Sequence, residues 1–178
     1  MKILDRLPIT AEHLILTVHG EPLKLRPHQI IIQISISPFH RQDPRTPVIP
    51  ALLDSGNNHN FSIQEHHLRR WAGIHPESLP FLRGLREGGR TPSLRSAHLR
   101  VHRNRAGRRE LRDTKPFPLH LPEGIAIYPS DGTNYPRLPL LGLRAIIKNE
   151  LKLVIDGKRK SASLRSPIWW RSASGQPH

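Results

Sequence analysis

The sequence lacks cysteine, so disulfides and thiolate metal sites are excluded. Aromatic residues make up only 5% of the chain, which argues against a surface that stacks nucleic-acid bases on aromatic rings. No apolar run has the length of a membrane span, and the first residues lack the apolar core of a signal peptide. We therefore expect a cytoplasmic protein without a membrane partner.

Histidine is abundant, and three of the side chains lie close in sequence: His59, His66 and His67. Their spacing does not match His-Glu-x-x-His or another zinc motif, and there is no cysteine to complete a site. A serine-hydrolase triad of Asp54, Ser55 and His59 is also disfavoured, because sequence neighbours rarely reach that geometry and no Gly-x-Ser-x-Gly elbow exists. We expect neither a metal nor an organic cofactor.

Acidic residues are also scarce, with 14 Asp and Glu against 28 Lys and Arg, a formal net charge of +14. This charge favours polyanionic partners, and the segment 83–112 is especially basic. No helix-turn-helix, RRM or KH pattern accompanies it. Nucleic-acid binding therefore stays an alternative that no motif supports.

Proline and glycine are frequent, with 18 and 12 residues, and the apolar runs between them are short. This pattern predicts one all-β domain. Strands are expected at Leu14 to Val18, 23–26, Gln29 to Ile36 and 124–128, a half-exposed strand at 96–102, and a short helix at 62–71. In the half-exposed strand, alternation assigns Ser96, His98, Arg100 and His102 to one face, and we expect His98 and His102 to be solvated.

The most informative segment is 47–63, where a short apolar strand runs into Asp54-Ser55-Gly56-Asn57. The apolar residues up to Leu53 predict a buried strand, and the turn formers after it end the strand abruptly. A carboxylate is thereby placed at the end of a buried strand. Burial of a carboxylate beside apolar residues is costly unless the acid is hydrogen-bonded or shares a proton, so its position here indicates a functional role.

A second informative segment lies downstream at 137–164. Leu140 and Leu141 run into Gly142, a short helix is expected from Leu143 to about Asn149, and a hairpin follows through Asp156-Gly157.

Together these two segments, in this order, resemble the retropepsin-like aspartic proteases, the single-lobe family that includes retroviral protease. In that family an apolar strand ends in Asp-Ser/Thr-Gly, and a later apolar-apolar-Gly precedes a short helix and a final hairpin. The resemblance implies an all-β, closed, barrel-like lobe with one short C-terminal helix, active as a two-fold homodimer. It covers 28–165, with 1–27 as an N-terminal extension with strands and 166–178 as a flexible tail.

The resemblance also implies roles for individual residues. Asp54, Ser55 and Gly56 would be catalytic: the carboxylate activates water, the Ser hydroxyl braces the dimer axis, and the glycine amide approaches the carboxylate. Substrate contacts are expected from Asn57, Leu141, Gly142 and a flap within 79–92 that carries Gly84, Gly88 and Gly89. Asn57 departs from the Ala or Ser that the family usually has there.

Aspartic proteolysis needs two carboxylates that share one proton, and this sequence has one Asp-Ser/Thr-Gly. The second Asp54 would therefore come from a second copy of the chain. We expect an endopeptidase that acts on polypeptides as a homodimer. The alternatives are a catalytically silent relative that binds peptides and the basic nucleic-acid-binding protein.

Overall fold

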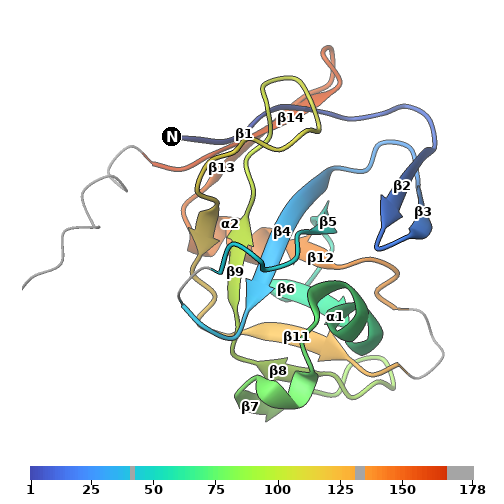
Figure 1. Cartoon of the computed structure of the whole chain (residues 1–178), viewed down its shortest axis with the longest axis vertical. Helices are drawn as coiled ribbons and strands as arrows, with labels where there is room; N and C mark the ends of the chain where they lie inside the picture. The colour runs from blue at the N-terminus through green and yellow to red at the C-terminus, as the bar shows by residue number, and fades with distance from the viewer. Residues whose placement is uncertain (41–42, 131–134, 168–178) are drawn as a thin grey trace, which may run out of the picture.

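The computed structural model describes residues 1–40, 43–130 and 135–167. This part of the chain is mostly β-structure, arranged in a nine-stranded sheet, a three-stranded sheet and a β2–β3 ribbon (Figure 1). The strands are β1 Lys2–Pro8, β2 Leu14–Val18, β3 Glu21–Leu25, β4 Ile31–Ser37, β5 Ile49–Asp54, β6 Phe61–Gln64, β7 Phe81–Gly84, β8 Ser93–Arg95, β9 His98–Val101, β10 Phe117–Leu119, β11 Ile125–Tyr128, β12 Leu140–Gly142, β13 Lys152–Asp156 and β14 Ser161–Arg165. The helices are α1 Glu65–Ala72, the 3-10 turn η1 Pro76–Ser78, and α2 Leu143–Lys148.

The large sheet has the strand order β10-β9-β4-β5-β12-β6-β11-β8-β7. Most neighbours are antiparallel, but β12 runs parallel to β5 and β11 runs parallel to β6. The all-β prediction is confirmed by this arrangement. The prediction of a closed barrel is wrong, because among the described residues β10 and β7 lie at open edges of the sheet. No helix in the described ranges is long and apolar enough to cross a membrane.

Insertion of β12 between β5 and β6 is the feature that positions the site. The strands β5 and β6 are consecutive in the chain, yet Leu140 pairs with Leu52 of β5 on one side and Ser62 of β6 on the other. Both β6 and β12 are buried along their whole length. Because polar backbone groups without water need partners, a strand between two others is the stable place for such an apolar segment.

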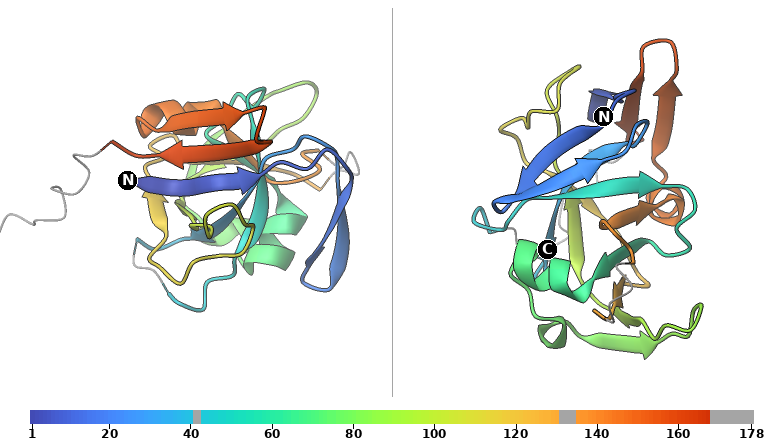
Figure 2. Two further views of the ribbon diagram at one scale, coloured as in Figure 1. Left: turned by 90° about the horizontal axis from the view of Figure 1, so that it is seen from above. Right: turned by 90° about the vertical axis from the view of Figure 1, so that its right-hand side faces the viewer.

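The N-terminal strand β1 belongs to the three-stranded sheet, where it pairs antiparallel with β14, and β14 pairs with β13. Figure 2 shows β1 lying beside β14, with both ends of the described chain on the same side of the molecule. Residues 1–27 thus contribute β1, β2 and β3, and Ile3, Leu4 and Leu7 join the main core. The predicted tail at 166–178 lies outside the described residues from 168 onward.

The helix expected at 62–71 begins later, at Glu65, because Phe61–Gln64 is a strand that pairs with both β12 and β11. The helix α1 buries Leu68 and Trp71 and ends at Gly73, whose φ of 67° suits a residue without a side chain. The expected hairpin through Asp156 is present as β13 and β14.

Candidate active site

Asp54 is the last residue of β5 and lies in register with Gly142 of β12. Its carboxylate is partly exposed, and Oδ1 accepts a hydrogen bond of 3.0 Å from the backbone N–H of Gly56. Ser55 and Gly56 are exposed at the turn. The turn therefore presents an oriented carboxylate at the surface, at the end of a strand from the interior of the sheet.

The connection between β5 and β6 passes over the end of β12, which explains why position 142 is glycine. The Gly142 N–H donates to the carbonyl of Asn60 at 3.0 Å. A Cβ at this position would lie 2.1 Å from the carbonyl oxygen of His59 and 3.0 Å from that of Asn57. Gly142 has a φ of −80°, so the requirement for glycine is set by close approach of backbone and not by its own conformation.

Asn57 has a structural place that the sequence pattern did not indicate. Its side chain is only 7% exposed, Nδ2 donates to the carbonyl of Leu140 at 3.2 Å, and Oδ1 accepts from the Ser62 hydroxyl at 2.9 Å and the His59 N–H at 3.3 Å. This amide ties the turn to β12 and β6. The sequence predicted that this side chain contacts substrate. In the structure it braces the Asp54 turn instead, because both ends of the amide are already hydrogen-bonded in the interior.

Leu141 is also buried, with 0% of its surface exposed, so its side chain belongs to the core. The structure brings Leu141 and Gly142 beside the Asp54 turn through the pairing of β12 with β5. Their contribution to the site is the shape of the strand that supports it.

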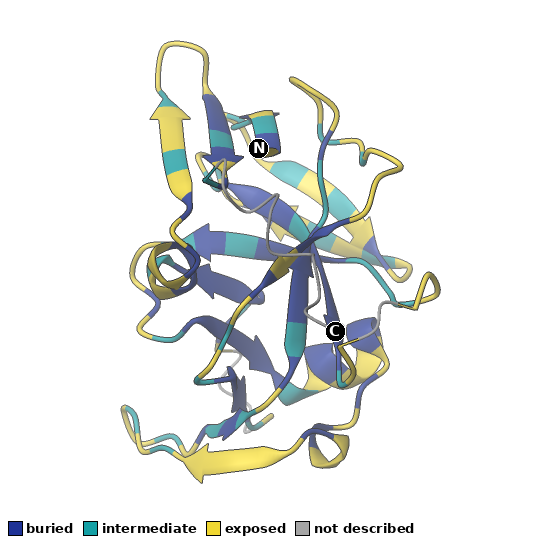
Figure 3. Cartoon of the chain, turned by 90° about the vertical axis from the view of Figure 1, so that its left-hand side faces the viewer, coloured by how far each residue is buried: buried dark blue, intermediate teal, exposed yellow. Residues whose placement is uncertain are grey.

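The segment expected to carry a flap forms a β-hairpin from β7 and β8. Gly88 and Gly89 lie at its tip with φ of 54° and 80°, and Glu87 and Arg90 exchange backbone hydrogen bonds around them. These φ values suit the primed turns that close two-residue hairpins. Gly84 ends β7, which is exposed along its length (Figure 3).

Glu87 joins the tip of this hairpin to the connection that follows Asp54. Its Oε2 accepts a hydrogen bond of 2.7 Å from the Tyr128 hydroxyl and lies 3.1 Å from Nε2 of His59. The bond from Tyr128 and then that from His59 hold the pKa of Glu87 below its usual value. Burial and the carboxylate of Glu87 together raise the pKa of Tyr128. No sequence pattern indicates this trio, because its members come from three separate segments.

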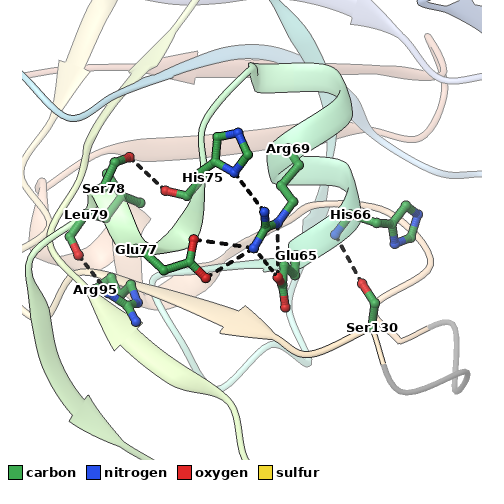
Figure 4. Close-up of polar contacts among 9 residues, drawn as sticks. All are labelled: Glu65, His66, Arg69, His75, Glu77, Ser78, Leu79, Arg95 and Ser130. Carbon is green, nitrogen blue, oxygen red and sulfur yellow. Dashed lines mark hydrogen bonds and ion pairs between the residues drawn. The ribbon is translucent and has the colours of Figure 1, made fainter.

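Polar contacts join α1 to η1 and, separately, the base of the hairpin to the residue that follows η1 (Figure 4). Nη2 of Arg69 donates to Glu65 at 2.7 Å and to Glu77 in η1 at 3.1 Å. Next to it, Nη1 of Arg95 in β8 donates to the carbonyl of Leu79 at 2.8 Å. The hairpin is thus anchored at its base and contacts the His59 loop near its tip.

The last part of the basic segment, residues 102–112, forms a loop that contacts the N-terminal strand, whereas 83–101 contains the tip of the β7–β8 hairpin, β8 and β9. Arg109 donates to the carbonyl of Pro8 at 2.8 Å, and Arg103 contacts the sulfur of Met1 at 3.0 Å. The Asn104 amide donates to the carbonyls of Arg105 and Arg108 at 2.8 Å each. Part of the basic charge therefore holds the loop in place, and Arg105 and Arg108 are exposed.

Comparisons of the chain with protein-family models, curated proteins and solved structures give no match. The resemblance to retropepsin-like proteases therefore rests on the two sequence segments alone.

Proposed function

We propose that this protein is an aspartic endopeptidase whose active site forms when two copies of the chain bring their Asp54 turns together. The observation that carries the proposal is the pairing of β5 with β12, which holds a partly exposed carboxylate at a strand end opposite Gly142. The Gly56 N–H orients that carboxylate, and the Asn57 amide braces the turn behind it.

The chemistry requires a second carboxylate. One aspartate takes a proton from water as the water oxygen attacks the peptide carbonyl carbon, and the protonated partner donates to the carbonyl oxygen. Collapse of the tetrahedral intermediate then passes a proton to the leaving amine. Among the described residues no carboxylate is hydrogen-bonded to Asp54. A two-fold homodimer supplies the missing group, because a symmetry axis beside Ser55 and Gly56 brings Asp54 opposite its own copy.

The hairpin of β7 and β8 is the element suited to cover a bound peptide. Its exposed Gly88–Gly89 tip is linked through Glu87 to the loop that follows the Asp54 turn. An extended substrate would bind as an added strand between the turns and the hairpins, with main-chain hydrogen bonds for affinity. Because the pair must share one proton, we expect activity on the acidic side of neutral.

The test is cleavage of a diverse peptide library between pH 4 and 7 by the wild type, Asp54→Asn, and Asp113→Asn as a control on an exposed acid in the basic loop. We expect Asp54→Asn to lower activity by at least about 10²-fold, since a general acid–base group contributes that much, and the control to keep full activity.

A mixing experiment tests the shared site separately. At constant total protein, equal amounts of wild type and Asp54→Asn should leave about a quarter of the activity if only dimers with two aspartates work, and about half if each chain works alone. Activity of Asp54→Asn, or the value of one half, would contradict the proposal. A dimeric wild type without activity would indicate the peptide-binding relative instead.

A further inference from the structure

A second hollow lies at the β9–β10 edge of the large sheet, and it shares no residue with the Asp54 turn. It is a cavity of ≈ 380 Å³ whose polar side chains include Arg100, His40, His98 and His120. Leu121 and Pro122 form part of its apolar wall. In the sheet β9 is separated from β5 by β4, so the cavity and the Asp54 turn belong to different places on the fold.

Arg100 is buried against the expectation from strand alternation, with only 6% of its surface exposed. Its strand pairs with β4 and β10 on both sides, which places Arg100 opposite Ser35 and Pro118. Nη2 donates to the backbone carbonyl of His40, whereas Nη1 is buried without a hydrogen-bond partner in the described ranges. The loop that carries His40 packs on Arg100. The alternation of residues along a single strand could not predict this contact.

Among the residues that the structure describes, no carboxylate compensates the charge of Arg100. Its side chain forms no ion pair with a described carboxylate, and the residues that line the cavity include no Asp or Glu. Burial lowers the pKa of Arg100, but a guanidinium stays protonated in proteins. A buried cation without a counter-charge is costly, and a bound anion relieves that cost.

The histidines of the cavity are His98 on β9 itself, His40 in the loop after β4 and His120 just after β10. The rings of His40 and His98 pack edge to face with centroids 5.1 Å apart. The backbone of His120 is fixed on both sides by Asn149, which accepts from its N–H at 2.7 Å and donates to its carbonyl at 3.0 Å. Burial, His40 and Arg100 lower the pKa of His98, as expected where positive groups gather without an acid.

We propose that this cavity is a binding site for a phosphate-type oxyanion, with Arg100 as its main cationic contact and His98 and His120 as further donors. Guanidinium and imidazole groups are the usual partners of phosphate oxygens. The anion is either free phosphate or the phosphate group of a small organic molecule whose remainder contacts the apolar wall.

The test is calorimetric titration of the full chain with inorganic phosphate and, separately, with phenyl phosphate, at constant ionic strength set by sodium chloride. We expect saturable binding in the calorimetric titration. In NMR spectra, the imidazole signals of His98 should move toward the positions of the protonated form, because a bound anion raises the pKa of nearby histidines. Equal affinity for the two probes assigns the site to free phosphate. Tighter binding of phenyl phosphate by tenfold or more assigns it to a phosphorylated organic molecule.

Three variants separate a built site from general attraction to a basic protein. Arg100→Gln should weaken binding about 10- to 100-fold, as expected for the loss of a charged hydrogen-bond donor, whereas the exposed Arg105→Gln should change it less than twofold. If Arg100→Gln does not fold, His120→Gln decides, because its backbone anchors to Asn149 do not involve the imidazole. Absence of saturable binding, or equal weakening by Arg100→Gln and Arg105→Gln, would overturn the proposal. Unchanged binding by His120→Gln would do so where Arg100→Gln cannot be measured.

Discussion

His67 should make the fold sensitive to acid in the pH range where we propose activity. The side chain is only 5% exposed in α1, its ring stacks on Trp71 with centroids 3.9 Å apart, and Nδ1 has no hydrogen-bond partner among the described residues. Burial, and then the neighbouring charge of His66, lower the pKa of His67 from 6.5 to about 3.

The sign and size of the effect follow from this pKa. Above pH 6.5 the imidazole is neutral in both states, so its stability contribution is fully present. Below pH 6.5 the unfolded chain binds a proton that the folded chain refuses down to about pH 3, so stability falls with pH. If folded His67 takes up no proton at all, the free energy of unfolding at pH 5 is lower by about 2 kcal/mol than above pH 6.5. We expect a loss of about 1 to 2 kcal/mol, because nearby water reduces the cost of protonating the ring.

The measurement is urea unfolding at pH 7.5 and pH 5 for the wild type, His67→Phe and His66→Phe. Phenylalanine keeps the stack on Trp71 and cannot take up a proton. We expect His67→Phe to lose about 1 to 2 kcal/mol less stability than the wild type between the two pH values, whereas the exposed His66→Phe behaves nearly like the wild type. Equal losses in the wild type and His67→Phe would refute the reasoning.

Two further changes test the architecture of the site. Gly142→Ala should destabilise the fold by about 3 kcal/mol in urea unfolding, since its Cβ would meet the His59 carbonyl at 2.1 Å, whereas Gly157→Ala, with nothing within 4 Å, should stay within about 0.5 kcal/mol. Equal effects of the two changes would contradict the role of close backbone approach. Glu87→Ala should raise amide hydrogen exchange across 85–92 by severalfold, because the hairpin loses its bonds to Tyr128 and His59; unchanged exchange would mean that these bonds do not hold the hairpin.

Elements with a local signature could be predicted from the sequence. The strand Leu14–Val18 has the expected bounds, and the helix after Gly142 begins at Leu143 as expected. The hairpin predicted around Asp156-Gly157 is also present, with Asp156 paired to Ser161 and residues 157–160 forming the connection. In each case the residues that determine the element are neighbours in the chain.

Features that depend on distant segments could not be predicted. The pairing of β1 with β14 joins the two ends of the described chain, and no pattern within β1 specifies that partner. Burial of Arg100 depends on the loop that carries His40, and the open edges at β10 and β7 depend on the packing of the whole sheet. Local alternation reports which residues share a face, but not what covers that face.

The same distinction applies to Asp54. A turn of Asp, Ser and Gly forms readily at the surface of many proteins, so the tripeptide alone does not specify a catalytic geometry. Here β12 arrives from far along the chain, and Gly142 lets the loop after Asp54 cross its end closely enough for the Asn60 carbonyl to accept the Gly142 N–H. Asn57 then fastens the same loop to Leu140. The position of the carboxylate is therefore set by contacts that exist only once β12 has entered the sheet. A substitution at Gly142 should displace the Asp54 carboxylate although Asp54 itself is unchanged.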